Sequence, residues 1–353
     1  MKKRSVPESV KAAMVIIGTV IGAGFASGQE VMRFFTGYGV KRLISIVLSG
    51  LLFIWICCLV FKGTQTEYQA YLETLMPRSV AGAVHGVTVA FTLFSYGAML
   101  AGSGALAQQE MGLHYYAGLL GMTAVSTAIL IAGKKGLIWL NLLVVPLMIV
   151  MLIWICLNHI GGLAVESAYL QASPLVLSWE GLPDLQFLGD GILYISYNLL
   201  TLIPVLCTLR ETLRGVRAKN TAAVLGGGVL MFLSFILGLA SLANYDTMKG
   251  MEIPLLVLLQ GQRLQSFLCF LVLWCAMLTT AVSDGYICME YLCQRGMPTQ
   301  AAGCIVAGLG IMIGCLGFSS LVGKVYPIFG VLGLGLLAAI IRRAFLREKE
   351  QFH

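Results

Sequence analysis

Charged residues are scarce in this chain of 353 residues. Asp, Glu, Lys and Arg make up only 11% of it, against roughly 25% in an average soluble domain. Hydrophobic residues make up 58%, and the mean hydropathy is +0.89. This composition excludes an ordinary soluble protein and predicts a polytopic, all-α membrane protein. Since no stretch is long enough for a separate soluble domain, residues 1–353 are expected to form a single transmembrane domain.

Motifs of metal sites and hydrolases are absent as well. The chain has four histidines and ten cysteines, with no C-x-x-C pair, no H-E-x-x-H and no G-x-S-x-G motif. Most cysteines lie inside apolar runs, where they are expected to be small core residues. We therefore expect neither enzyme activity nor an organic cofactor. The net charge of +7 comes from basic residues scattered in loops and at both termini, which favours membrane topology over nucleic-acid binding.

Ten apolar segments are long enough to span a bilayer. They lie at about 11–36, 40–61, 79–108, 114–133, 136–157, 185–210, 220–243, 264–293, 299–318 and 321–345. The connection 244–263 contains a short apolar piece, Ile253 to Leu259, which we expect to be re-entrant or to cap the bundle. If the N-terminus is inside, 17 Lys and Arg residues lie on the inner side and six outside. This predicts a multi-pass protein of the cell membrane with both termini cytoplasmic and the loop 158–184 outside.

Glycine interrupts the first segment between Gly18 and Gly28. The residues Gly18, Gly22 and Gly24 fall within seven positions, and each is less favourable in a helix than Ala by about 1 kcal/mol. Unwound backbone at membrane depth is tolerated only where protein buries it or a water-filled cavity meets it. The sequence therefore predicts a broken helix and a binding site. Close packing of another helix on these small residues is the alternative.

Two sets of five segments, about 11–157 and 185–345, would form an inverted repeat, because an odd set crosses the membrane in the opposite direction. A second break is then expected in the sixth segment, at Ser196-Tyr197-Asn198, between Gly189-Asp190-Gly191 and Pro204. Asn is a poor helix former and Pro lacks a backbone donor. Two interrupted segments in corresponding positions are typical of a transporter's midplane site.

The run GTVIGAG, from Gly18 to Gly24, resembles the G-x-x-I-G-x-G signature of the amino acid–polyamine–organocation superfamily. The longer string GTVIGAGFASGQE resembles, more narrowly, the YkvI-like membrane proteins of bacteria. The resemblance implies a LeuT-type fold, with about ten transmembrane helices in a 5+5 inverted repeat and breaks in helices 1 and 6. It also implies secondary transport, without naming a substrate.

A second resemblance lies in the eighth segment. The run AMLTT, from Ala276 to Thr280, is similar to the A-x-x-T-[ST] run of sodium-coupled relatives such as the neurotransmitter:sodium symporters. It implies Na⁺ as coupling ion, held by the carbonyls of Gly18, Ile21 and Ala276 and the hydroxyls of Thr279 and Thr280. The alternative is that both hydroxyls bond back to carbonyls four residues earlier.

At two positions the sequence differs from these relatives, and each difference argues against one type of ion site. Phe25 stands where the symporters place an Asn that binds their other sodium ion, so a second sodium site is not expected. Some proton-coupled relatives fill the sodium position with a Lys from helix 5, but residues 136–157 contain no Lys. Proton coupling through a carboxylate stays open.

The first break can hold a carboxylate. The amides of Ala23, Gly24 and Phe25 begin the second half of the broken helix, where N–H groups and the helix dipole favour an anion.

An ammonium group would face the opposite run, Ser196, Tyr197 and Asn198, which offers carbonyls and an amide. Ser95 or Tyr96 would line the pocket from the third segment, although an aromatic residue in mid-helix is more often a packing residue. A small zwitterion, such as an amino acid, fits both partners.

Ionisable residues inside the membrane are costly and are commonly functional. Glu30 is expected either to pair with Arg33, three residues on, or to take part in gating. Asp190 is a candidate proton site or cap of the second break, and Asp284 a candidate for assisting ion release.

Sodium-coupled symport of an amino acid or similar zwitterion by alternating access is the leading hypothesis. A proton-coupled transporter is one alternative. The other is a ligand-sensing receptor subunit, because spore-germination receptor subunits resemble the same superfamily. Expected partners are the small-molecule substrate and the lipid bilayer; the sequence indicates no nucleic acid and names no protein partner.

Overall fold

The computed structural model describes residues 7–35, 41–132, 137–160 and 186–351. The predicted outer loop 158–184 lies almost entirely outside these residues. In the described part every regular element is a helix. The helices are α1 (Glu8–Val20), α2 (Ala23–Ala26), α3 (Gln29–Phe35), α4 (Lys41–Phe61), α5 (Tyr68–Leu75), α6 (Arg78–Met111), α7 (Tyr115–Ala132), α8 (Leu137–Asn158), α9 (Gln186–Thr212), α10 (Val216–Ala243), α11 (Tyr245–Met248), α12 (Pro254–Val257), α13 (Arg263–Cys293), α14 (Thr299–Gly314), α15 (Phe318–Ser320), the π-helical turn η4 (Leu321–Val325) and α16 (Tyr326–Gln351).

The ten predicted segments are confirmed. Seven helices of the described residues are long and apolar enough to cross a membrane: α4, α6, α7, α9, α10, α13 and the stretch from α15 to α16. Shorter apolar helices cover Val144–Asn158, within α8, and Thr299–Gly314. The interrupted first segment, α1 to α3, completes the set. The predicted bounds differ from the observed ones by a few residues, except near the ends of the last two segments.

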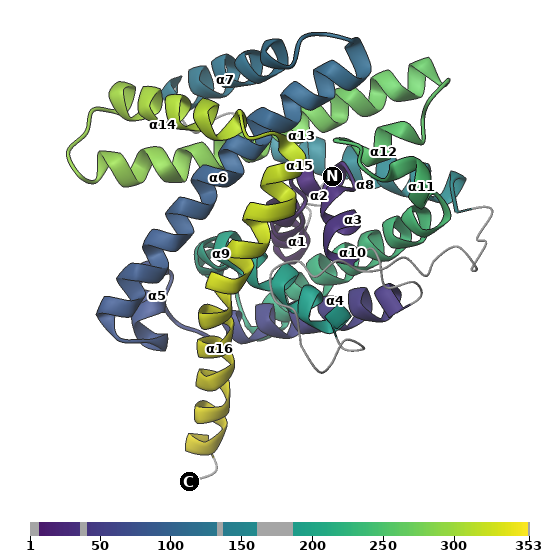
Figure 1. The fold of residues 1–353 in the computed structure, drawn as a ribbon. Helices are drawn as coiled ribbons and strands as arrows, with labels where there is room; N and C mark the ends of the chain where they lie inside the picture. The colour runs from purple at the N-terminus through teal and green to yellow at the C-terminus, as the bar shows by residue number, and fades with distance from the viewer. Residues whose placement is uncertain (1–6, 36–40, 133–136, 161–185, 352–353) are drawn as a thin grey trace, which may run out of the picture.

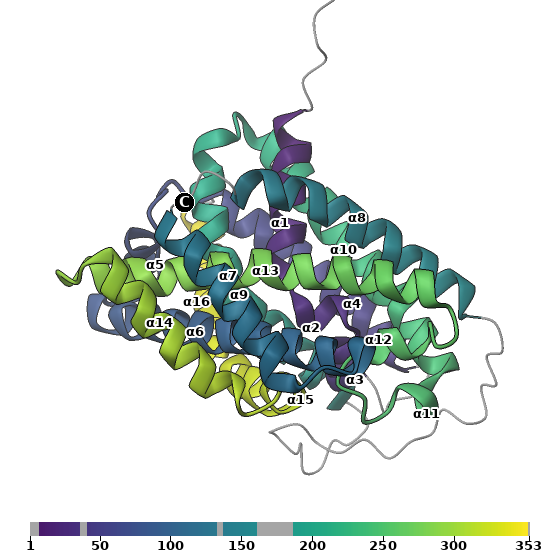
Figure 2. The ribbon, with the colours of Figure 1, turned by 90° about the horizontal axis from the view of Figure 1, so that it is seen from above.

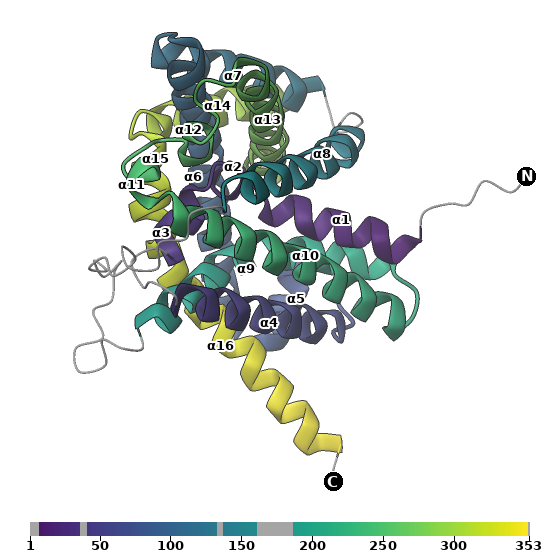
Figure 3. The same ribbon diagram turned by 90° about the vertical axis from the view of Figure 1, so that its right-hand side faces the viewer.

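Two groups of four segments make up most of the molecule (Figure 1). The first segment packs with α4, α9 and α10, whereas α6, α7, α13 and α14 pack on one another. Figure 3 shows the same division from the side, with α7, α13 and α14 together in its upper part and α4 and α10 below. In Figure 2, seen from above, α7 and α13 lie in front of the other group. Helices in corresponding positions of the two halves pack in pairs, α1 on α9, α4 on α10 and α6 on α13. An inverted repeat would produce this pairing, and its bounds stay a prediction.

The predicted break of the sixth segment is wrong for this structure, because α9 runs without interruption from Gln186 to Thr212. Asn198 is satisfied within the helix, because its amide donates to Tyr194 O at 2.8 Å. Gly191 serves packing. A Cβ added at Gly191 would lie 2.7 Å from Ser45 Oγ, which shows how closely α4 approaches.

Glycines on both helices also allow α6 and α14 to pack closely. A Cβ at Gly310 would lie 2.5 Å from Tyr96 Cδ1, and a Cβ at Gly97 would lie 2.7 Å from Ile313 Cβ. Each glycine therefore receives a large side chain of the other helix. Contacts through small residues let membrane helices pack closely without a hydrophobic driving force.

We expect Gly310→Ala to lower the free energy of unfolding by about 1–3 kcal/mol, because the methyl group overpacks this contact. Gly308→Ala is the matched control, since a Cβ there meets nothing within 4 Å. Thermal unfolding of the purified protein in detergent measures both. Equal melting temperatures for the two variants would show that the α6–α14 contact is not close-packed.

Candidate substrate and ion site

Two interruptions, not one, divide the first membrane segment. At the first, α1 ends and Ile21 adopts φ −76° and ψ 78°. The Gly22 amide, which in an unbroken helix would donate to Gly18 O, donates to Val20 O at 2.8 Å instead. The second lies between α2 and α3, where Gly28 has φ 84°, a backbone conformation that favours glycine. The Gly18 carbonyl therefore loses its helical partner, as the sequence predicted for a break.

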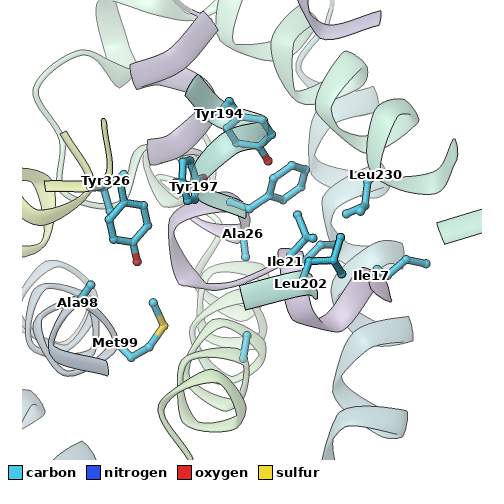
Figure 4. Close-up of a cluster of buried hydrophobic side chains, with 14 of the residues drawn as sticks. Ile17, Ile21, Ala26, Ala98, Met99, Tyr194, Tyr197, Leu202, Leu230 and Tyr326 are labelled. Carbon is cyan, nitrogen blue, oxygen red and sulfur yellow. The ribbon is translucent and has the colours of Figure 1, made fainter. Parts of the chain in front are cut away.

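The first interruption faces α13. A Cβ placed on Gly22 would lie 3.7 Å from Thr280 Cγ2, 3.9 Å from Thr280 Oγ1 and 4.0 Å from Met99 Cε. In Figure 4 the hydroxyl of Tyr326 and the tip of Met99 of α6 point toward one another, beside the segment that carries Ala26. The structure thus brings together the break and the threonine run that the sequence pairs as an ion site.

The threonine hydroxyls are already donors in this structure. Thr279 Oγ1 donates to Ala276 O at 2.8 Å, and Thr280 Oγ1 donates to the same oxygen at 3.1 Å. Each hydroxyl oxygen keeps acceptor capacity for a cation. The Ala276 carbonyl, which accepts both bonds, is the least available of the predicted ligands. Neutral oxygens from Gly18, Thr279 and Thr280 fit a hard monovalent cation, and the sodium site stays a prediction.

The Glu30 side chain is buried against α2 and does not lie at the outer end of the segment. Its side chain is 3% exposed, and Oε2 accepts a hydrogen bond of 2.6 Å from the Tyr197 hydroxyl. A Cβ added at Gly24 would lie 2.8 Å from Glu30 Cγ, so the side chain lies directly on the backbone of α2. Arg33 lies against η4, where a Cβ on Gly323 would be 3.8 Å from Arg33 Nε. The protein's own carboxyl therefore occupies the space beside the amides predicted to hold a substrate carboxylate.

An aromatic cluster surrounds this carboxyl. The Tyr197 ring lies 5.3 Å from Phe34, 5.7 Å from Phe91 and 5.2 Å from Tyr326, measured between centroids. Tyr194 packs on the other side of Tyr197, at 5.5 Å. These rings come from α3, α6, α9 and α16 and join the two groups of helices next to the break.

A second carboxyl, Asp284 of α13, is 6% exposed. Its Oδ2 is buried and has no hydrogen-bond partner among the described residues. Ser95 of α6 lies beside both this carboxyl and the Tyr326 hydroxyl. Because Ser95 and Met99 are four residues apart, they share one face of α6, and this face looks toward the break.

Other predicted residues lie elsewhere. Tyr96 is buried among helices of its own group, with its hydroxyl 3.2 Å from Ser126 Oγ of α7, which is the packing role. Ser196 lies against α16, where a Cβ on Gly333 would be 2.8 Å from its Oγ. Asn198 bonds to its own helix. Asp190 is buried within α9 and caps no break. The structure does not place these three predicted residues at the first interruption: Tyr96, Ser196 and Asn198.

The segment 252–262 caps the second interruption, at Ser27 and Gly28, as was predicted for the short apolar piece Ile253 to Leu259. The Leu255 amide donates to Ser27 O at 2.9 Å. The Gln109 side chain binds Ile253 twice, accepting from its amide at 3.2 Å and donating to its carbonyl at 3.1 Å. The Ser319 amide donates to Glu252 Oε2 at 2.8 Å. The sequence carried no signal for Gln109, Glu252 or Tyr326, because each is linked to the site only through tertiary contacts.

These features define a multi-pass membrane protein with the LeuT-type fold, as comparison with solved structures shows. The chain is similar to MhsT in complex with L-phenylalanine, with a TM-score of 0.64 and 18% identity over 94% of this chain and 88% of that one. It is similar to Mhp1, a nucleobase-cation-symport-1 family transporter, with a TM-score of 0.64 and 13% identity; the match covers 96% of this chain and 78% of Mhp1. It is also similar to a manganese transporter from Eremococcus coleocola, with a TM-score of 0.62 and 14% identity; the match covers 94% of this chain and 78% of that transporter. At these identities the similarity establishes the fold alone.

Two proteins of Bacillus subtilis (strain 168) are similar in sequence over nearly the whole chain. The uncharacterized protein YyaD is 25% identical over 342 residues, which cover 94% of this chain and 96% of YyaD. The uncharacterized membrane protein YkvI is 24% identical over 349 residues, which cover 96% of each. The resemblance to the YkvI-like proteins is confirmed. No family model matches the chain.

We expect Gly24→Ala to lower the free energy of unfolding by about 1–3 kcal/mol, because the methyl group displaces the Glu30 side chain from α2. Gly22→Ala, whose methyl group meets Thr280 only at ordinary contact distance, is the control. Thermal unfolding in detergent is measured for both variants, alone and with Glu30→Ala. The cost of Gly24→Ala should shrink in that background. An unchanged cost would show that the two residues are not in contact.

Proposed function

We propose that this protein is a secondary transporter that carries a small zwitterion, such as an amino acid, across the cell membrane together with Na⁺. The observation that carries the proposal is the interruption at Ile21–Gly22, which faces Thr280 of α13. A helix broken at membrane depth is costly unless its freed groups bind something. Transporters with broken helices bind substrates and coupling ions at such places.

Sodium is supported by the kind of oxygen that the break and α13 present. The Gly18 carbonyl has lost its helical donor, and Thr280 places a hydroxyl oxygen of α13 near Gly22, with the hydroxyl of Thr279 on the preceding residue. A bound ion would accept one lone pair from each of these oxygens. Their role is to replace part of the hydration shell of the ion.

An amino group in the substrate is supported by the position of Glu30. Its carboxyl group lies against Gly24 and accepts a hydrogen bond from Tyr197. A positively charged group that enters the break would therefore meet a buried carboxyl group. An incoming carboxylate would need the Glu30 side chain to move off α2. MhsT, whose structure contains L-phenylalanine, is consistent with an amino acid.

Alternating access is supported by the cap over the break. The cap contacts the break through Ser27, the end of α6 through Gln109, and the start of the last segment through Ser319. These three contacts must separate if the break is to open toward the side on which the cap lies. With the N-terminus in the cytoplasm, that side is the outer one.

Coupling to protons is a second candidate, favoured by the two buried carboxyl groups. Glu30 accepts a hydrogen bond from Tyr197, which packs on Tyr326, and both Glu30 and Asp284 lie close enough to Tyr326 to interact with it electrostatically. Intramembrane carboxylates of transporters commonly carry protons. In this mechanism Glu30 would exchange the Tyr197 hydrogen bond for a proton during the cycle.

The sodium site is tested by uptake of labelled amino acids into proteoliposomes under a sodium gradient. We expect Thr279→Val with Thr280→Val to raise the sodium concentration for half-maximal uptake by roughly tenfold or more. Thr123→Val is the control, because Thr123 makes the same type of bond, to Leu119 O at 2.8 Å, away from the break. Sodium-driven uptake that persists unchanged in the double variant would exclude this ion site.

Uptake measured under a pH gradient without sodium distinguishes proton coupling from sodium coupling. If protons are coupled through Glu30, Glu30→Gln should abolish uptake driven by the pH gradient while leaving exchange of labelled for unlabelled substrate. Uptake driven by sodium alone and indifferent to the pH gradient rules the alternative out. Substrate binding without uptake under either gradient would instead favour a sensor.

A further inference from the structure

A cavity of about 770 Å³ lies outside the site described above. It is formed where α4 ends, α10 begins and the C-terminal half of α16 passes beside α5. All of these chain ends belong to the face that the distribution of basic residues places in the cytoplasm. Its lining residues are Leu59, Phe61, Lys62, Gly63, Thr64, Tyr71, Thr74, Leu75, Val216, Lys219, Asn220, Ile340, Arg343 and Ala344.

The charges of this cavity have one sign. Lys62, Lys219 and Arg343 come from three different elements, and none of the lining residues is acidic. A cavity lined by one sign of charge between apolar walls concentrates ions of the opposite sign. The cavity is therefore suited to an anion.

The first turn of α10 strengthens this preference. Its N-cap is Gly215, with φ 83°, and no side chain caps the helix. Val216, Lys219 and Asn220 of the first turns line the cavity. The uncapped amides of a 28-residue helix and its dipole favour negative charge at this end.

Arg343 supplies an independent observation. Its Nε is buried and has no hydrogen-bond partner among the described residues. A buried guanidinium nitrogen without an acceptor is costly, and such atoms are uncommon in folded proteins. An anion in the cavity would provide the acceptor.

Arg210 lies behind the turn that lines the cavity and is not itself a lining residue. Its guanidinium donates to the carbonyls of Val60 and Gln65 and lies 4.4 Å from the centroid of the Tyr71 ring. It holds the turn after α4, which contains Lys62 and Gly63, in place. Since both terminal nitrogens of Arg210 are occupied in this way and Arg210 does not line the cavity, the anion site rests on Lys219 and Arg343.

We propose that this cavity binds a phosphate group carried by an amphipathic molecule. Leu59, Phe61, Leu75 and Ile340 provide apolar wall beside the basic residues. The volume falls in the range of pockets for organic ligands, which extends from roughly 300 to 1,000 Å³, and is far larger than inorganic phosphate requires. The headgroup of an anionic phospholipid fits this chemistry, because basic pockets between membrane helices on the cytoplasmic side bind such headgroups. A soluble phosphate compound is the other source.

The test uses the full-length protein in neutral detergent, titrated with short-chain phosphatidylglycerol while the melting temperature is recorded. Short-chain phosphatidylcholine and inorganic phosphate are titrated in parallel. The pocket variant combines Lys219→Gln with Arg343→Gln. The control combines Arg217→Gln with Arg342→Gln, two exposed residues on the same helices that do not line the cavity and carry the same total charge.

Phosphatidylglycerol should raise the melting temperature of the unmodified protein and of the control, and phosphatidylcholine should not. In the pocket variant the half-maximal lipid concentration should rise roughly tenfold or more. If inorganic phosphate acts with the same dependence on the variants and phosphatidylglycerol adds nothing, the source is soluble. Equal responses of pocket variant and control, or no response to either phosphate compound, would overturn the proposal. Lys219→Gln alone replaces the double variant if the latter does not fold.

Discussion

Backbone groups freed inside a membrane must find partners, and the two interruptions of the first segment, at Ile21–Gly22 and at Gly28, impose this constraint on everything around them. The Gly22 amide turns back to Val20, the Ser27 carbonyl accepts from Leu255 of the cap, and Gly28 takes a positive φ. The cap lies against the second interruption, and α13 brings Thr280 next to Gly22 at the first. In the proposed function, ion, substrate and gate meet at this stretch of about ten residues.

Tyr197 connects this stretch to the rest of the fold. Its hydroxyl bonds to Glu30, and its ring packs on residues of α3, α6 and α16. Opening the break on either side would disturb the carboxyl and the aromatic cluster together. The Glu30–Tyr197 hydrogen bond lies within one helix group, and the contact of the Tyr197 ring with Phe91 of α6 connects it to the other. Close packing through glycines such as Gly310 joins the helices within a group.

The sequence predicted features that depend on local composition. Apolar length located the ten segments, and clustered glycines located the first break. The same reasoning failed for α9, because Gly191 serves close approach of α4 and Asn198 is satisfied by its own helix, neither of which composition reveals. Tyr326, more than 290 positions beyond Glu30 in the chain, could be joined to the site only by tertiary structure.

Hydrogen–deuterium exchange of the protein in detergent, with sodium or with an equal concentration of a large organic cation, tests the central claim most directly. The account predicts that sodium slows exchange in peptides covering residues 18–28 and 276–280, and that Thr279→Val with Thr280→Val removes the effect. Exchange in these peptides that is indifferent to sodium, or protection confined to other parts of the chain, would contradict the assignment of the break as the ion site.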